Sequence, residues 1–367
     1  MTLQRVDEAW VESLDTPALL VELEVLEANV DRMADDLRGR GIGLRPHFKT
    51  HKTIEVAQLQ QRRGAVGQSC ASLGEAKVLA AAGFSDIFVA LPLWPGGAKR
   101  RALQELHDQT DLTVGVDSIE GTAALADVVQ GATSPLKVLV EIDTGGRRTG
   151  VRPGDAGDLA VAAARAGLDV TGVFTHGGHS YGLGDAAQRA ACDEIAGLAT
   201  AVESLRRHGM EARVVSAGST PTALLSADGL VTEERPGTYV FGDRQQVVIG
   251  SCRPSDVALV VATTVMSRAI DDQVVLDAGT KCLGRELQPW LRGYADIQGW
   301  PQLNLERLYD HHGVATVASD DERPMVGDVL VMVPNHVCPV VNLARELVVI
   351  DHDQIVDRWA VAARALV

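Results

Sequence analysis

The chain has 367 residues, of which 46% are hydrophobic and only 4% aromatic, so it can bury a large aliphatic core and is not expected to be disordered. A formal net charge of −15 argues against nucleic acid and anionic membranes as partners, because phosphate groups would be repelled over most of the surface. Five cysteines without paired spacing indicate reduced thiols, and the first twenty residues contain no long apolar run, so we expect a soluble cytoplasmic protein without a membrane span.

Short aliphatic runs alternate with longer amphipathic segments over the first two thirds of the chain, and this alternation predicts eight strand-helix units. The strands are expected at 18–21, 42–46, 67–71, 87–90, 113–116, 137–142, 170–175 and 214–217, and the helices at 23–38, 54–63, 73–82, 98–107, 119–128, 155–166, 186–208 and 221–225. Eight parallel strands close into a barrel whose catalytic groups lie at the carboxyl ends of the strands. An open doubly wound sheet is the alternative architecture.

The pattern changes after about residue 250. Aliphatic runs at 258–265, 273–276, 328–333 and 347–350 are separated by turns and not by long helices. This pattern predicts a second, β-rich domain.

The segment Arg-Pro-His-Phe-Lys-Thr-His-Lys, residues 45–52, follows the second expected strand. A lysine that a strand delivers into a basic and partly apolar pocket can lose its proton and act as an amine nucleophile. Lys49 is therefore the candidate for a Schiff base. An ordinary solvated basic patch is the alternative interpretation.

A glycine-rich loop after the seventh expected strand contains two imidazoles and a phenol, His176, His179 and Tyr181. Such a cluster suits proton transfer near neutral pH. Each histidine by itself is equally compatible with a surface or helix-capping position.

Two further motifs at strand ends can bind anions. The segment Ser-Ala-Gly-Ser-Thr-Pro-Thr after the eighth expected strand combines small residues with a helix start, which suits a phosphate. The alternative is a plain helix N-cap by Ser219 or Thr220. Arg147 and Arg148 follow the sixth expected strand and can hold a ligand anion or a ring nitrogen, or form an ordinary ion pair.

His336 and Cys338 lie two residues apart in the segment Val-Pro-Asn-His-Val-Cys-Pro. In an extended segment this spacing points both side chains to one side, and imidazole with thiolate is a soft pair that favours zinc. Two protein ligands leave positions open for water or a substrate hydroxyl. A lone cysteine is usually just a small apolar residue, but Pro334 and Pro339 stiffen this segment.

Six motifs, in this order, resemble the family of D-threonine aldolases and D-serine dehydratases, which are pyridoxal-phosphate enzymes of the alanine-racemase fold type. They span nearly the whole chain, at 45–52, 176–181, 218–222, 235–239, 277–281 and 334–339. The resemblance implies an α/β protein with an N-terminal (β/α)8 TIM barrel that binds the cofactor, at 18–248. It also implies a C-terminal β-rich domain that carries the metal pair, formed by 1–17 and 249–367, and a head-to-tail homodimer.

Carried over position by position, the resemblance assigns a cofactor site and a metal site. The implied cofactor-binding residues are Lys49, Arg147, Tyr181, Gly218, Ser219 and Thr220, with Arg148 as a competitor for Arg147. The implied catalytic residues are Lys49, His176 and His179. The implied metal ligands are His336 and Cys338, and we associate histidine with cysteine more with zinc-dependent dehydratases than with aldolases. Zinc is favoured over manganese and other divalent ions.

The expected function is a lyase that needs pyridoxal 5′-phosphate and a divalent metal and acts on a D-configured β-hydroxy amino acid. In the D-serine-dehydratase-like reaction, Lys49 removes the Cα proton, and a 2-oxo acid and ammonia form. The first alternative is a D-threonine aldolase, in which His176 or His179 removes the hydroxyl proton to give glycine and an aldehyde. An amino-acid racemase or a non-catalytic pyridoxal-phosphate-binding protein is the second alternative.

Overall fold

The computed structural model describes residues 14–318, 322–352 and 354–366. By their contacts these residues form two compact units. The barrel unit comprises residues 32–49, 56–237 and the end of the chain from 366, and the β unit comprises residues up to 31, 50–55 and 238–365. The domain bounds predicted from the sequence, 18–248 and 1–17 with 249–367, stay a prediction.

Eight parallel strands form the sheet of the barrel unit, in the order β2-β9-β8-β7-β6-β5-β4-β3. Hydrogen bonds from Val66 N to Leu44 O and from Ser69 N to Pro46 O, both 2.9 Å long, join the two ends of this order and so complete the ring. The predicted fold class, an α/β barrel with a β-rich second domain, is confirmed. The strands are β2 (Gly43–Leu44), β3 (Gln68–Cys70), β4 (Asp86–Pro92), β5 (Asp111–Val116), β6 (Lys137–Glu141), β7 (Asp169–Phe174), β8 (Val214–Ala217) and β9 (Glu233–Glu234).

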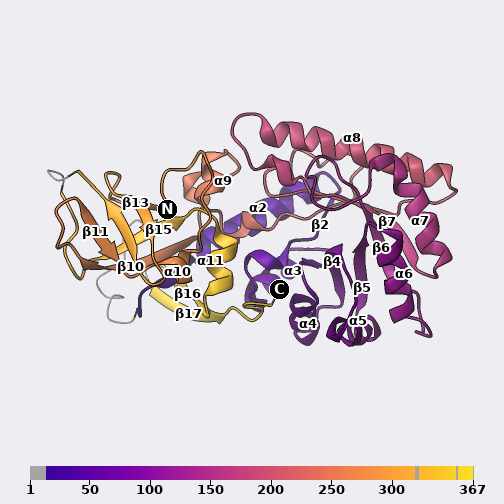
Figure 1. The fold of residues 1–367 in the computed structure, drawn as a ribbon, viewed down its shortest axis with the longest axis horizontal. Coiled ribbons are helices and arrows are strands. Elements are labelled where there is room, and N and C mark those ends of the chain that lie inside the picture. Colours follow the sequence, from indigo (N-terminus) through magenta and orange to yellow (C-terminus); the bar gives the residue numbers. More distant parts are fainter. Residues whose placement is uncertain (1–13, 319–321, 353, 367) are drawn as a thin grey trace. The chain divides into compact units, whose positions relative to one another are not determined.

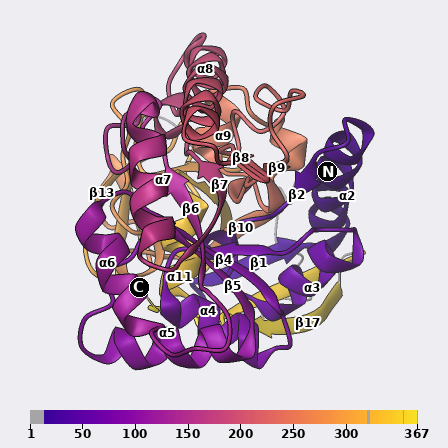
Figure 2. The ribbon, with the colours of Figure 1, turned by 90° about the vertical axis from the view of Figure 1, so that its right-hand side faces the viewer.

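Helices surround the strands of the barrel, as Figure 2 shows for α5 to α8. Two of them begin at serine N-caps: the Ser72 hydroxyl accepts from Glu75 N at 3.1 Å, and the Ser118 hydroxyl accepts from Gly121 N at 3.2 Å. The longer helices are α2 (Leu23–Gly39), α3 (Ile54–Arg62), α4 (Leu73–Ala81), α5 (Ala98–Gln109), α6 (Ile119–Val128), α7 (Ala156–Arg165) and α8 (Ala186–Arg207). Among the described residues, every helix is too short or too polar to span a bilayer.

Two elements predicted for the barrel are wrong. The first expected strand is β1 (Ala18–Glu22), which pairs with β10 (Leu259–Ser267) and β16 (Glu346–Asp351) of the β unit. An uninterrupted apolar run fits any fully buried strand, so its pattern does not identify its sheet. The helix expected at 221–225 is a series of turns, and the short β9 is the strand that completes the eight.

The β unit holds a nine-stranded sheet, most of whose strands are drawn in orange and yellow in Figure 1. Its order is β13-β14-β11-β10-β1-β16-β17, with β15 paired to β10 and β12. The remaining elements are β11 (Gln273–Leu276), β12 (Ala295–Ile297), β13 (Asn304–Leu308), β14 (Gly313–Thr316), β15 (Val329–Pro334), β17 (Gln354–Ala360), α9 (Arg244–Val248), α10 (Thr280–Leu283) and α11 (Val337–Leu343). Its core is aliphatic and contains Leu20, Val257, Val260, Ala262, Val331, Val333, Val348 and Ile350.

Candidate active site

The polar loops of the barrel unit follow the carboxyl ends of its strands. Lys49 follows β2 in the short helix η1 (Phe48–Thr50), His176 follows β7, and Gly218 follows β8. Parallel barrel strands end on one face, where barrel enzymes carry their active sites. Lys49 is half-buried, and its backbone N–H donates to Nδ1 of His47 at 3.4 Å.

His176 lies within electrostatic reach of Lys49 and two arginines. Burial, followed by the positive charges of Lys49, Arg148 and Arg235, lowers the pKa of His176 to about 3, and a hydrogen bond to the Gly218 backbone opposes this shift. The imidazole is therefore neutral near pH 7, so it can accept a proton or a hydrogen bond. Three of the groups that act on His176 are thus cations.

His179 has different surroundings from His176. Its Nε2 lies 3.1 Å from Oδ2 of Asp193 on α8, and its ring packs against Gly145 so closely that a Cβ there would lie 3.0 Å from ring atoms. Its Nδ1 is buried and lacks a hydrogen-bond partner among the described residues. Tyr181 is half-buried and directly follows this turn, η3 (Gly178–Ser180). The two histidines expected as one cluster thus face different groups.

The two adjacent arginines after β6, Arg147 and Arg148, also have different surroundings. Arg147 is exposed and has a positive φ of 50°, and its N–H donates to Oδ1 of Asp143 at 2.9 Å. Arg148 lies 4.0 Å from Oε1 of Glu141, and its charge contributes to the lowered pKa of His176. Of the two, Arg148 is the one that reaches the surroundings of His176.

The segment from Gly218 to Thr222 is a hydroxyl-rich turn. Gly218 has a φ of 95°, a conformation that favours glycine. The Ser219 N–H donates to Oγ1 of Thr222 at 2.9 Å, and the Ser219 hydroxyl lies 2.9 Å from that of Ser180. The backbone makes single helix-type bonds here, from Ala223 N to Ser219 O at 2.9 Å and from Ser226 N to Thr222 O at 2.8 Å, without continuing as a helix. The contact between the Ser219 and Ser180 hydroxyls joins the loops after β7 and β8, while Thr220 is half-buried in the same turn.

Arg235 is not among the site residues predicted from the sequence, and it lies in the interior of the barrel. It is 4% exposed, and its guanidinium donates to the Ser216 hydroxyl at 2.5 Å and to the carbonyl of Thr175. The guanidinium also lies 5.6 Å and 5.3 Å from the ring centroids of Phe88 and Phe174. A fully buried arginine is rare without partners. The signal in the sequence was its place in the motif Arg-Pro-Gly-Thr-Tyr.

In the β unit, a buried aspartate orients His336. Nδ1 of His336 lies 3.0 Å from Oδ2 of Asp243, which also accepts from Val337 N at 3.1 Å. Burial lowers the pKa of His336, but the neighbouring Cys338 and Asp243 outweigh it and raise this pKa well above its ordinary value. The thiol of Cys338 lies 3.4 Å from Oγ1 of Thr50.

This arrangement fits a divalent metal, although the segment is not extended as the spacing argument assumed. His336 is the N-cap of α11, and Cys338 lies in the first turn of that helix. The bond to Asp243 leaves Nε2 of His336 available to a ligand, and carboxylate-oriented imidazoles are typical of metal sites. Imidazole with thiolate is a donor set that suits zinc.

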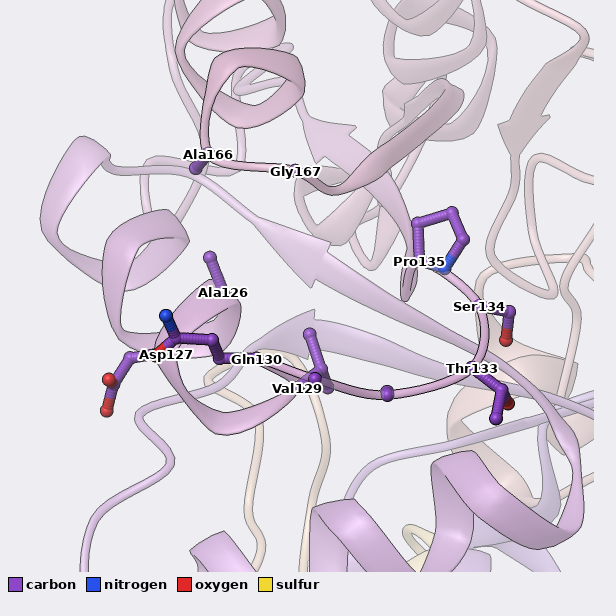
Figure 3. Close-up of a pocket in the computed structure, with 11 residues that line it drawn as sticks. Ala126, Asp127, Val129, Gln130, Thr133, Ser134, Pro135, Ala166 and Gly167 are labelled. Carbon is purple, nitrogen blue, oxygen red and sulfur yellow. The ribbon is translucent and has the colours of Figure 1, made fainter.

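A cavity of about 540 Å³ lies at the other end of the barrel strands (Figure 3). The loops that line it, 126–135 and 166–167, precede β6 and β7. Asp127, the ionisable residue among those that line it, is paired with Arg100 at 2.6 Å. Barrel enzymes carry their active sites at the carboxyl ends of the strands, so this cavity at the opposite end is a poor candidate for the active site.

Two family models match the chain. The model of the alanine racemase N-terminal domain matches residues 21–245, and that of the serine dehydratase domain matches residues 258–350.

Individual relatives are similar over nearly the whole chain. The D-threo-3-hydroxyaspartate dehydratase of Delftia sp. (strain HT23) is 37% identical over 350 residues, covering 89% of this chain and 91% of that protein. The D-threonine aldolase of Arthrobacter sp. is 33% identical over 361 residues, covering 96% and 93%. Among solved structures, a cysteine-to-alanine variant of D-threo-3-hydroxyaspartate dehydratase in the metal-free form has a TM-score of 0.89 and 34% identity, covering 95% of this chain and 98% of that chain.

Proposed function

Because this chain belongs to the alanine-racemase N-terminal-domain family, we propose that it is a pyridoxal-5′-phosphate-dependent lyase of D-configured β-hydroxy amino acids. The similar dehydratase and aldolase support this class of substrate. The observation that carries the proposal is the group of Lys49, His176 and Arg148 at the carboxyl ends of the barrel strands.

The residues of the barrel unit fit a phosphorylated, anionic cofactor. Three cations, Lys49, Arg148 and Arg235, act on His176 and can attract an anion to this part of a protein whose net charge is −15. We propose that Lys49 holds the cofactor covalently and that the turn of Gly218, Ser219 and Thr220 binds its phosphate. Because the N–H groups of Gly218 and Ser219 donate to Glu194 and Thr222, the hydroxyl groups of the turn are the proposed donors. When bound, the cofactor supplies an electron-withdrawing ring conjugated to the substrate amine.

Two further residues complete this proposed site. Tyr181 remains the proposed neighbour of the ring. For the arginine we propose Arg148 in place of Arg147, because Arg148 is the one that acts on His176. An arginine in this position can pair with a carboxylate or another anionic group of the ligand.

Proton movement in the proposed reaction depends on Lys49 and His176. The Lys49 amine takes the proton from the substrate Cα, and its position after β2 delivers it to the catalytic face. His176 stays a proposed base for the proton of the β-hydroxyl group, the step that an aldolase needs, although its low pKa makes it a weak base. His179, tied to Asp193, keeps a proposed role as the alternative base.

We propose His336 and Cys338 as metal ligands, with Asp243 holding the imidazole in place. A divalent metal, when bound, supplies a Lewis acid for the substrate hydroxyl group. Zinc is favoured because the donor set is soft. The cysteine favours a dehydratase, and the 33% identity to an aldolase keeps retro-aldol cleavage as the second candidate.

One assay distinguishes these two reactions. The protein, loaded with pyridoxal 5′-phosphate and zinc, is incubated separately with D-serine, D-threonine and D-threo-3-hydroxyaspartate. A dehydratase gives a 2-oxo acid and ammonia, whereas an aldolase gives glycine and an aldehyde. The L-enantiomers are the matched controls and are expected to give no product. Turnover of none of the three D-substrates would contradict the proposal.

A further inference from the structure

Two buried carboxyl groups lie against the turn at Gly218. Oε1 of Glu194, on α8, accepts from the Gly218 N–H at 3.1 Å. Oε2 of Glu234, in β9, lies 1.9 Å from the point where a Cβ on Gly218 would be. Both glutamates are 0% exposed. The turn therefore contacts two carboxyl groups, and the missing side chain of Gly218 leaves room for that of Glu234.

Glu234 is the carboxyl group with an oxygen that clearly lacks a partner. Its Oε2 is buried and makes no hydrogen bond among the described residues, whereas Glu194 is stabilised by Thr222, Gly218 and Gly177. A buried carboxylate with an unsatisfied oxygen is costly. A protonated carboxyl group has no charge and gains a donor. One added proton thus removes much of the cost of burying this pair.

The surroundings assign that proton to Glu234. Burial raises the pKa of both groups, but Glu194 receives stabilising hydrogen bonds from Thr222 and Gly218. For Glu234 burial is again the largest cause, the charge of Glu194 raises its pKa further, and the hydroxyl of Ser226 at 2.8 Å opposes them. These surroundings favour the shared proton on Glu234 over Glu194.

The other charges near the pair do not remove the need for the proton. Arg235 is the cation that acts on both carboxyl groups, and it also interacts with Glu233 and Glu141. Glu233 adds negative charge beside Glu234, although Arg45 pairs with Glu233 at 2.8 Å. His176, which shares the turn, is neutral. Acids thus outnumber the cations that face the pair.

We propose that Glu194 and Glu234 are positioning residues that together hold one proton beneath the Gly218 turn, and that this proton strengthens the binding of an anion by the turn. The inference rests on the proposed function, in which the anion is the cofactor phosphate. Loss of the proton places a second buried negative charge beside the turn, and this charge repels the anion. By linkage, anion binding must raise the proton affinity of the pair, so binding takes up a proton at a pH where the free protein has partly lost it.

The test uses pyridoxine 5′-phosphate, which carries the phosphate but has no aldehyde to react with Lys49. Its dissociation constant from the full-length, cofactor-free protein is measured by calorimetry between about pH 7 and pH 10, where its phosphate stays dianionic because the second pKa is about 6. We expect the wild-type constant to rise by up to about tenfold per pH unit once the pair loses its proton. Glu234→Gln, which stays neutral, should flatten this rise and bind more tightly than wild type at the alkaline end.

Proton uptake gives a second reading of the same experiment. Titrations in two buffers of different ionisation enthalpy should show uptake on binding to the wild type and less uptake with Glu234→Gln. The matched control is Glu203→Gln on the exposed face of α8, which should behave like the wild type. Equal pH profiles for wild type and Glu234→Gln would overturn the inference.

A measurement without ligand separates this inference from the proposed function. A raised folded-state pKa means that the wild type loses unfolding free energy as pH rises from the ordinary glutamate range through the raised pKa, and Glu234→Gln should lack this loss. If the wild type shows that loss but binds no pyridoxine 5′-phosphate, the cofactor role of the turn fails while the proton pair stands. If Glu234→Gln does not fold, the infrared band of a protonated carboxyl group in the wild type decides, and its absence at neutral pH contradicts the pair.

Discussion

Both units have apolar cores, but they differ in the charged residues that they bury. The β unit packs aliphatic residues such as Val260 and Val348, whereas the barrel unit buries Arg235 among Glu194 and Glu234. Apolar burial stabilises a fold by about 25 cal/mol per Å² and needs no partner. Buried charges cost free energy unless they are paired. The stability of the barrel interior should therefore depend on how its charges are paired and protonated, and that of the aliphatic core of the β unit should not.

The largest effect is expected from removing the amine at the catalytic face. Lys49→Ala should lower turnover of the D-amino acid by about 10³-fold or more, because both the covalent hold on the cofactor and the base for the Cα proton are lost. The variant should also lose the visible absorption band that borohydride bleaches in the wild type. Lys77→Ala, an exposed lysine paired with Glu105 at 2.8 Å, is the control and should keep both properties. A band retained in the Lys49 variant would place the covalent linkage on another amine.

In the β unit, Asp243 and His336 form a polar pair at the proposed metal site. Asp243→Asn keeps the size of the side chain but weakens the bond that orients the imidazole, so we expect metal affinity to fall by about 10 to 100-fold. The measurement is a competition titration with a chelator, with turnover followed at saturating metal. Asp328→Asn serves as the control in the same unit. Unchanged affinity in Asp243→Asn would mean that His336 does not need its partner, or that the metal lies elsewhere.

Periodicity and local motifs predicted most of the fold but could not assign strands to sheets. The alternation of strand and helix gave the barrel, yet β1 was assigned to it because an apolar run of four residues looks the same in either sheet. β9 has only two residues, Glu233 and Glu234, and no apolar pattern marks a strand that carries two acids. Such a strand is identified only by its pairing with its neighbours β2 and β8 in the folded structure.

For the candidate site, too, the sequence could predict some residues and not others. Loops that follow strand ends could be found from the sequence, since the position of Lys49 or His176 depends only on the strand before it. Partners that are far apart in the chain could not be found in this way. Asp243 lies 93 residues from His336, and nothing in the local sequence connects them. The choice between Arg147 and Arg148 depends on which of the two charges acts on His176, which a doubled arginine in the sequence does not reveal.

The smallest effect, and the sharpest contrast with the buried acids, concerns the aliphatic core. Val260→Ala removes side-chain volume at a position that is 1% exposed, so we expect it to lower the unfolding free energy by about 1 to 3 kcal/mol. Val356→Ala, at a position that is 51% exposed, should change it by less than about 0.5 kcal/mol. Because no charge is involved, the cost of Val260→Ala should be the same at pH 6 and pH 9 in chemical denaturation, unlike that of Glu234→Gln. A pH-dependent cost at Val260 would show that the two interiors are energetically coupled, and the contrast between them would then no longer hold.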